Sequence, residues 1–297
     1  MRIVTRPDFD GVVCAVLLQA AEFIDAPTCW IEPSVIQKGT APIRTGDILA
    51  NLPYDPRCSI WFDHHVSNRI LTPFQGAWRI APSAAGVIHD HYRDRFTTDF
   101  SPLVRQADKI DAADLTREEV LFPERHPFLL LSMTISSRRK DAAYWDHLVT
   151  LLGRRPDEAP IDDPRAAARC RQVLEDNETY RRFLLAHTEL RGHVAITDLR
   201  SHENIPEGNR FLCYALFPQC AVQVRIRRDP SDRGRISLSI GHSIFNRTCN
   251  VNVGLMLSAF GGGGHRGAGG CSLDAARADA NLERILAILM ENKSNEP

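Results

Sequence analysis

The chain has 297 residues, of which 43% are hydrophobic and 25% are charged, and its formal net charge is −1. This length favours two domains, and the composition is ordinary for a globular protein. The near-zero charge excludes a global attraction to nucleic acid, so local cations or metal ions have to hold any anionic substrate. No run approaches the ~18 apolar residues of a membrane span, no signal peptide is visible, and the eight cysteines form no CxxC pair. We therefore expect a cytoplasmic protein without membrane partners.

Residues 1–115 alternate short β-like runs with helical patterns. We expect strands at 3–5, 48–52 and 59–62, and helices at 12–23, 84–92 and 103–110. This alternation predicts an α/β fold, in which a parallel sheet carries helices on both faces. Residues 125–152 are also expected to be largely helical.

A polar segment with two prolines at 153–160 predicts a domain boundary. A helical pattern follows from Arg165 to about Leu190 and is expected to bridge two lobes. The rest of the chain predicts a smaller α/β lobe. Its strands are expected at 193–199, 221–227 and 236–240, and its helices at 211–216, 253–260 and 281–290.

Several acidic residues adjoin the ends of predicted strands. They are Asp8, Asp10, Asp47 and Asp63, and a further pair, Asp108 and Asp111, lies at the end of a predicted helix. A single Asp in such a place is usually a turn or cap residue. Asp63, however, opens the triplet Asp63-His64-His65, and ligands of open α/β sheets bind beyond the carboxyl ends of the strands. We therefore expect the acids and the histidine pair to converge on one cleft.

Converging carboxylates repel one another and lose solvation, and divalent cations remove that cost. Oxygen ligands mixed with imidazole favour Mn²⁺ or Mg²⁺ over a thiolate-bound metal. Two such ions roughly 3.5–4 Å apart would activate a water molecule and hold a phosphoryl oxygen. The acids therefore predict a metal centre for phosphoryl chemistry.

A glycine-rich segment at 261–270 contains His265 and Arg266. Backbone N–H groups in glycine runs can approach an anion closely, and the two side chains add donors suited to phosphate. The alternative is a flexible linker, which rarely embeds a His-Arg pair. Upstream, Arg247 and Asn250 could face the same anion.

These motifs together resemble the DHH phosphoesterase superfamily with its C-terminal DHH-associated domain. The resemblance rests on the order of Asp8-Phe9-Asp10, Asp47, Asp63-His64-His65, Asp108 and the segment 261–270, and it covers nearly the whole chain. The subgroup includes nano-RNA phosphodiesterases, phosphatases of 3′-phosphoadenosine 5′-phosphate, and exopolyphosphatase-related proteins. It implies a metal-binding domain at 1–155, a linker helix at 156–190 and a substrate-binding domain at 191–297.

The resemblance also implies roles for single residues. Asp8 would ligate one metal and Asp10 the other, and Asp47 would bridge the two ions. His64 would join the second site, Asp63 would either ligate or support His64, and His65 would lie near the substrate phosphate. Asp108 is our choice for the last acidic ligand, with Asp111 as the alternative. The implied substrate-binding residues are Arg247, Asn250, Gly262, Gly263, Gly264, His265 and Arg266.

One position departs from the family pattern. Many members carry a metal-ligating His four positions before the first Asp, where this chain has Val4. The first metal site would therefore have one protein ligand fewer than usual.

Our leading hypothesis is hydrolysis of phosphodiester bonds in short single-stranded oligonucleotides or related phosphorylated nucleotides, in a cleft between two domains. Two Mn²⁺ ions are expected, with Mg²⁺ or Co²⁺ as alternatives. Long duplex nucleic acid is not expected as a partner, because the overall charge is close to neutral. Inorganic polyphosphate or 3′-phosphoadenosine 5′-phosphate is the alternative substrate, and a non-catalytic nucleotide sensor is a third hypothesis. The oligomeric state stays open, with a homodimer allowed.

Overall fold

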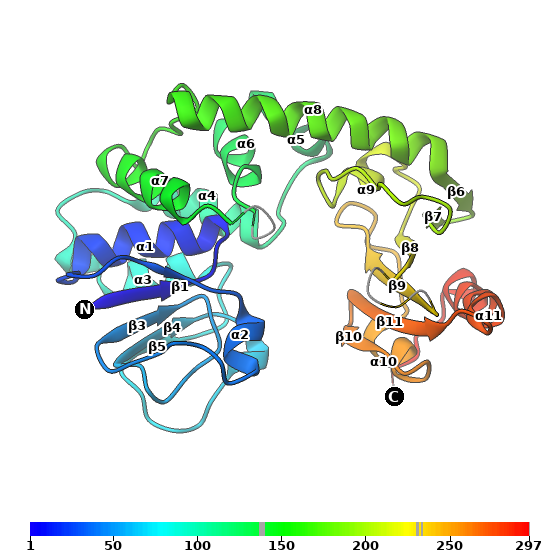
Figure 1. Ribbon diagram of the computed structural model, residues 1–297, viewed down its shortest axis with the longest axis horizontal. Helices are drawn as coiled ribbons and strands as arrows, with labels where there is room; N and C mark the ends of the chain where they lie inside the picture. Colours follow the sequence, from blue (N-terminus) through cyan, green and yellow to red (C-terminus); the bar gives the residue numbers. More distant parts are fainter. Residues whose placement is uncertain (137–139, 230–231, 233, 297) are drawn as a thin grey trace. The chain divides into compact units, whose positions relative to one another are not determined.

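The computed structural model describes the chain except residues 137–139, 230–231, 233 and 297. Its contacts divide the chain into two compact units. Unit 1 comprises Met1–Leu115 and Pro123–Val173, and unit 2 comprises Thr116–Phe122 and Leu174–Pro297. The helix expected from Arg165 is α8 (Pro164–His187), and the division between the units falls within it (Figure 1).

Unit 1 is built on a five-stranded sheet in the order β2-β1-β3-β4-β5. All neighbouring strands run parallel, which confirms the predicted sheet type. The strands are β1 (Arg2–Thr5), β2 (Cys29–Trp30), β3 (Asp47–Ala50), β4 (Ile60–Asp63) and β5 (Gly76–Trp78). Because parallel strands share one direction, their carboxyl ends lie at a single edge of the sheet.

Both faces of this sheet are buried, because successive side chains point to opposite sides. Ile3, Ile48 and Phe62 face the larger apolar cluster, which includes helix α1. Their neighbours Val4, Leu49 and Trp61 face a second cluster with Ile36. A sheet covered on both sides explains why its strands are continuous apolar runs rather than alternating ones.

Helices provide these covers. They are α1 (Phe9–Ala21), α2 (Pro33–Gln37), α3 (Ala84–His91), α4 (Ser101–Asp111), α6 (Pro127–Met133) and α7 (Ala142–Arg154), with 3₁₀ turns at Val66–Asn68, Arg93–Arg95 and Pro123–Arg125. Helix α1 is apolar on all sides, since α3, α4 and α7 pack around it. Figure 1 shows α1 and α7 layered over the same side of the sheet. Of the predicted helical stretch 125–152, residues 137–139 lie outside the described part.

Unit 2 contains a six-stranded sheet in the order β10-β11-β9-β8-β7-β6. Only β7 and β8 pair in parallel among its described strands. The strands are β6 (Thr188–Arg191), β7 (Val194–Asp198), β8 (Val222–Arg228), β9 (Arg235–His242), β10 (Gly263–His265) and β11 (Ala268–Asp274). This mixed sheet, with its helices, confirms a second α/β body.

Four further helices of unit 2 are α5 (Arg117–Leu121), α9 (Leu212–Leu216), α10 (Val253–Ser258) and α11 (Ala278–Glu291). The core of the unit lies between the sheet and two of these helices, α10 and α11. Alternate strand residues such as Val224 and Leu238 pack with Met256 of α10 and Ile285 of α11. Across the described residues, no helix is both long and apolar enough to cross a bilayer.

Three local predictions differ from the structure. The strand expected at 48–52 is β3, which begins and ends earlier, at Asp47 and Ala50. The long helix ends at His187, and the residues expected to continue it form strand β6. The glycine-rich segment contains a hairpin of β10 and β11, in which Gly264 faces Gly269 and His265 faces Ala268. Backbone pairing with a neighbouring strand outweighs the low strand propensity of glycine here.

We predict that Gly264→Ala destabilises unit 2, whereas Gly263→Ala does not. Gly264 has a φ of +151°, and a Cβ there would lie 2.3 Å from the Ala268 carbonyl oxygen. Gly263 is the matched control, because a Cβ at that position meets no atom within 4 Å. We expect Gly264→Ala to lower the free energy of unfolding by about 2 kcal/mol in denaturant titrations. Equal stability of the two variants would show that the hairpin does not need this close approach.

Candidate metal centre

Three segments of unit 1 meet at the carboxyl edge of its sheet. Asp8 and Asp10 follow β1, and Asp8 caps the first turn of α1. His64 follows β4, and Asp111 is the last residue of α4. One ligand atom from each of Asp10, His64 and Asp111 lies within 4.8 Å of the others, which is a spacing that can hold a metal ion.

The turn after β1 depends on a glycine. A Cβ at Gly11 would lie 1.9 Å from the Arg6 carbonyl oxygen. The chain can therefore fold back tightly enough for the Gly11 N–H to donate to Asp8 Oδ1 at 2.8 Å. This close approach brings both acids of the Asp8-Phe9-Asp10 motif to the start of α1.

The start of helix α3 holds the Asp10 carboxylate, which is 2% exposed. The backbone N–H groups of Ala84 and Ala85 donate to its two oxygens at 2.9 and 2.8 Å. A helix N-terminus stabilises an anion. Burial nevertheless raises the pKa of Asp10 well above its ordinary value, and the nearby charges of Asp111 and Asp8 raise it further.

His64 presents one ring nitrogen to the acids. Its Nδ1 lies 2.9 Å from the Ala81 carbonyl oxygen, which can only accept a hydrogen bond, so Nδ1 carries the proton. Nε2 lies 3.3 Å from Asp111 Oδ2 and 4.0 Å from Asp10 Oδ2. In the neutral tautomer with the proton on Nδ1, Nε2 carries the lone pair that can bind a metal ion. Nε2 is buried and has no hydrogen-bond partner. A carbonyl that fixes the ring tautomer is also the usual support of a metal-binding His.

Asp8 is the more exposed acid of the first motif, with 28% of its side chain accessible. It also accepts a hydrogen bond from Asn51 Nδ2 at 3.0 Å. Burial raises the pKa of Asp8 to about 6, although the Arg6 guanidinium 3.2 Å away opposes that shift. The buried acids therefore lack enough positive charge of their own, and a divalent cation would supply it.

Asp63 supports His65 rather than His64. Its Oδ1 lies 2.8 Å from His65 Nδ1, and its Oδ2 accepts from Asn68 Nδ2 at 2.7 Å. The hydrogen bond to Asp63 raises the pKa of His65, and partial burial opposes this. His65 is therefore favoured in its cationic form, which suits a group that faces phosphate.

The structure places Asp111, not Asp108, beside Asp10 and His64, which favours the alternative to our choice. Asp108 Oδ1 accepts a hydrogen bond from the Ser83 hydroxyl at 2.6 Å. Ser83 caps α3 by accepting from the Gly86 N–H at 2.9 Å. Asp108 thus steadies the helix N-terminus that binds Asp10. The error is one helical turn, because residues three apart lie on neighbouring parts of one helix face.

The prediction that Asp47 bridges two metal ions is wrong. Asp47 begins β3 and pairs with Arg2 at the start of β1, so it lies at the amino edge of the sheet. Its fully buried carboxylate accepts from Arg2 Nε at 2.9 Å and from Arg2 Nη2 at 2.7 Å. The Arg44 N–H adds a third bond at 2.8 Å. Asp47 therefore has a structural ion pair and no free oxygen near the site.

Asn51, which the sequence interpretation missed, lies at the carboxyl end of β3. Its side chain is 1% exposed and contacts Asp8. The signal was present, because a polar residue directly follows Ala50, but the predicted strand ran through it to residue 52. Val4 is buried in the apolar cluster on the α2 side of the sheet, so it offers no ligand.

The predicted anion-binding residues of unit 2 lie around the β10–β11 hairpin. Arg266 is at its turn, forms an ion pair with Glu296, and accepts the Val253 N–H with its carbonyl at 2.9 Å. His265 is exposed. Asn250 instead donates from Nδ2 to the Asn292 carbonyl at 3.2 Å, and Arg247 Nε donates to the Ile244 carbonyl at 3.1 Å. The hairpin thus presents His265 and Arg266 together, while Arg247 and Asn250 bind nearby backbone.

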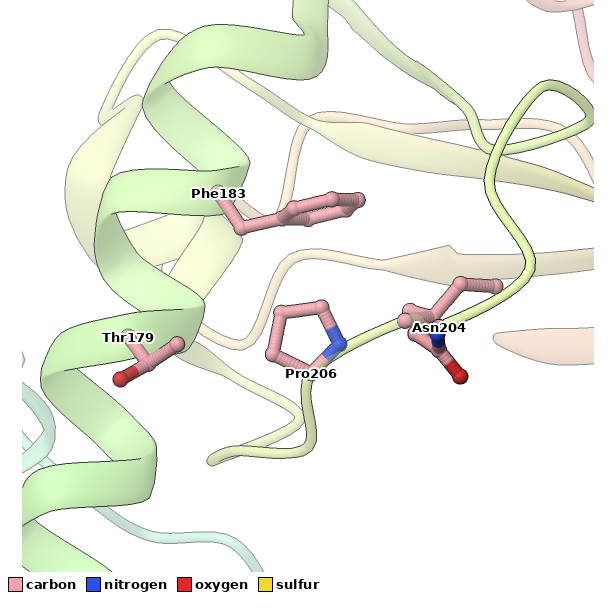
Figure 2. Close-up of a pocket in the computed structure, with 5 residues that line it drawn as sticks. Thr179, Phe183, Asn204 and Pro206 are labelled. Carbon is pink, nitrogen blue, oxygen red and sulfur yellow. The ribbon is translucent and has the colours of Figure 1, made fainter.

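Unit 2 also has an open pocket. Its lining residues are Thr179, Phe183, Asn204, Ile205 and Pro206. Figure 2 shows the Phe183 ring and Pro206 on facing sides, with Asn204 on the adjoining loop. None of the five carries a charge, so this pocket has no cation of its own to neutralise a phosphate.

Solved structures resemble the whole chain. A pGpG-specific phosphodiesterase, PggH from Vibrio cholerae, has 31% sequence identity and a TM-score of 0.82, covering 98% of this chain and 99% of that one. An exopolyphosphatase-related protein from Bacteroides fragilis has 12% identity and a TM-score of 0.54, covering 98% and 92%. The exonuclease RecJ bound to manganese has 14% identity and a TM-score of 0.57, covering 100% and 91%. Neither a protein-family model nor a curated protein matches the chain.

The likeness to the phosphodiesterase extends over nearly the full length of both chains, and the site occupies the DHH triplet and the acids around it. The chain belongs to the DHH phosphoesterase superfamily. It is a hydrolase that acts on phosphoester bonds. The two more distant likenesses support the fold alone.

We expect Asp47→Ala to lower stability and to spare metal binding. The change leaves Arg2, whose side chain is 16% exposed, without its buried partner. Loss of one partner of a buried ion pair costs about 3 kcal/mol or more. Denaturant unfolding and Mn²⁺ titration measure the two effects. Asp25→Ala, which removes an exposed ion pair with the N-terminus, is the control and should change neither. If the Asp47→Ala protein were as stable as the wild type but bound Mn²⁺ more weakly, Asp47 would have to be assigned as a metal ligand after all.

The raised pKa of Asp8 predicts a pH-dependent stability of the metal-free protein. The carboxyl titrates near 3.8 when unfolded and at about 6 when folded, so folding binds a proton between these values. The stabilising contribution present below pH 3.8 is therefore lost as the pH rises through 6. We expect the free energy of unfolding of metal-free Asp8→Asn to be larger than that of the wild type at pH 7.5, by on the order of 2 kcal/mol. At low pH the two free energies should be equal.

The control for this measurement is Asp99→Asn, because hydrogen bonds from Ser101 lower the pKa of Asp99. Replacing Asp99 should therefore change stability in the opposite direction, with a decrease at neutral pH. If Asp8→Asn also decreased stability at pH 7.5, burial would not dominate at Asp8.

Proposed function

We propose that this chain hydrolyses the phosphodiester bond of short linear dinucleotides of the pGpG type, using divalent cations held at the carboxyl edge of unit 1. The observation that carries this proposal is the group formed by Asp10, His64 and Asp111, in which His64 Nε2 is buried without a partner. A buried imidazole nitrogen beside two carboxylates is a set of ligand atoms that suits a divalent cation.

The donor set supports a second ion as well. Asp10, His64 and Asp111 would hold the first ion, and Asp8 would contribute to a neighbouring one. Mixed carboxylate and imidazole donors favour Mn²⁺, with Mg²⁺ and Co²⁺ as alternatives. When bound, such ions lower the pKa of a coordinated water and neutralise phosphoryl oxygens.

The protein groups around the ions position and polarise the substrate. Asp10 stays fixed because the N-terminus of α3 binds both of its oxygens. His65, held by Asp63 and favoured as a cation, would donate a hydrogen bond to a phosphoryl oxygen as charge develops on it. The leaving oxygen needs a proton, and His65 is the group we assign to supply it.

The dinucleotide is the substrate that the likenesses favour. The phosphodiesterase with 31% identity is described as specific for pGpG, and it aligns with 98% of this chain. In unit 2, His265 and Arg266 lie together at one hairpin turn, and these two side chains would bind a phosphate group. Arg266 is paired with Glu296 at present, so substrate would have to replace that acid.

The alternative substrates, polyphosphate and 3′-phosphoadenosine 5′-phosphate, would use the same metal centre. A channel for a long polyphosphate needs many cations on one path, whereas the cations here are scattered among ion pairs such as Arg79–Asp90 and Arg95–Glu22. The third hypothesis, a non-catalytic nucleotide sensor, is not carried further, because the chain is a phosphoester hydrolase.

We expect Mn²⁺-dependent release of mononucleotide from pGpG by the wild type. His64→Ala and Asp10→Asn should each lower kcat by about 100-fold or more, because they remove donors of the metal centre. His265→Ala should mainly raise KM. His89→Ala is the matched control, because His89 lies on α3 and stacks on Phe96 away from the acids. Phosphate release from polyphosphate or 3′-phosphoadenosine 5′-phosphate, with pGpG left intact, would show that a dinucleotide is not the substrate.

A further inference from the structure

Two buried side-chain atoms of the described residues lack a hydrogen-bond partner, and both belong to this region of unit 1. They are His64 Nε2 and Asn51 Oδ1. A buried polar atom without a partner is costly, so such atoms usually meet a ligand, an ion or a water. His64 Nε2 is explained by the metal group, whereas Asn51 has no role in what precedes.

The contacts of Asn51 fix the orientation of its amide. Nδ2 donates to Asp8 Oδ1 at 3.0 Å, and the same oxygen accepts the Gly11 N–H. A flipped amide would turn its oxygen toward the carboxylate of Asp8, where two acceptors would face each other. The Asn51 backbone N–H donates to the Phe62 carbonyl at 3.1 Å, which anchors the residue between β3 and β4. The amide oxygen is therefore a buried acceptor without a partner, on a residue that contacts Asp8.

We propose that Asn51 Oδ1 is a ligand of the divalent cation beside Asp8. This inference rests on the proposed metal centre and adds a neutral donor to it. Asn51 contacts Asp8, and Asp8 lies close enough to Asp10 and Asp111 for their charges to interact. A cation can satisfy the orphaned amide oxygen and the carboxylates at once, as amide oxygens do in other hard-metal sites.

A neutral ligand has a consequence for the charge of the site. Asp8, Asp10 and Asp111 already repel one another, and an amide oxygen adds a donor without adding to that repulsion. It also leaves more of the positive charge of the ions uncompensated, which favours an anionic phosphate. In this chain Val4 and Asp47 contribute no ligand, so Asn51 fills a coordination position that would otherwise fall to water.

The backbone at Asn51 allows a clean test. Its φ is 57°, in the left-handed region that Gly, Asn and Asp tolerate best. Asn51→Gly therefore removes the whole amide without adding backbone strain. Asn51→Asp keeps an oxygen at the same place but loses the Nδ2 donor. Asn292→Gly is the matched control, because Asn292 has a φ of 52° and belongs to unit 2.

The experiment is a Mn²⁺ titration of the metal-free full-length chain, in which the electron paramagnetic resonance signal measures the concentration of free Mn²⁺. We expect Asn51→Gly to weaken at least one Mn²⁺ site by about tenfold or more. Asn51→Asp should bind at least as tightly as the wild type, and Asn292→Gly should match it. The melting temperature of each metal-free variant shows that it is folded.

Two outcomes would overturn the role of Asn51. One is an Asn51→Gly protein with wild-type Mn²⁺ affinity, which would assign the amide oxygen to an ordinary buried water. The other is equal weakening in Asn51→Gly and Asn51→Asp, because then the Nδ2 bond to Asp8 matters and the oxygen does not. Failure of the wild type itself to bind Mn²⁺ is distinct from both, because it would remove the metal centre and the proposed function together.

Discussion

Repulsion among wholly or partly buried carboxylates is the constraint on which the rest of unit 1 depends. Asp8, Asp10 and Asp111 interact unfavourably as charges, and burial raises the pKa of the first two. Such a cluster persists only when the fold fixes it and something positive relieves it. The N-terminus of α3 provides part of this relief through two backbone bonds to Asp10. The remainder is the work of the divalent cations that we propose.

The acids of unit 1 divide into two groups according to the sheet edge at which they lie. At the amino edge, Asp47 is neutralised by Arg2 and joins the starts of β1 and β3. At the carboxyl edge, Asp10 accepts hydrogen bonds from two backbone N–H groups and from the Cys14 thiol. Asp47 thus stabilises the fold through its ion pair, whereas Asp10, with which none of the described guanidinium groups pairs, is the acid that we propose for the metal centre. This contrast follows from chain direction, because parallel strands have all their amino ends at one edge of the sheet and all their carboxyl ends at the other.

Sequence reasoning could predict those features that depend on local pattern. Apolar runs separated by helical stretches predicted the parallel sheet, and the acids after β1 and the histidines after β4 were expected at its carboxyl edge. It could not assign Asp47, because strand limits shift by one or two residues and an aspartate at a strand start looks like one at a strand end. The choice between Asp108 and Asp111 depends on how α4 is rotated about its axis. The hairpin around Gly264 depends on pairing with β9, which is distant in the sequence.

Asn51 shows why pattern alone finds acids more easily than it finds amides. A carboxylate is conspicuous near a strand end, whereas an asparagine is read as a turn residue. Its left-handed backbone, its burial and its single hydrogen bond to Asp8 emerge only from the fold. The same fold leaves its oxygen and His64 Nε2 without hydrogen-bond partners, in a region where Asp8, Asp10 and Asp111 repel one another despite the Arg6 guanidinium beside Asp8. These unpaired atoms and the repelling acids are the basis on which we propose a cation site, even though the sequence motif departs from its usual form.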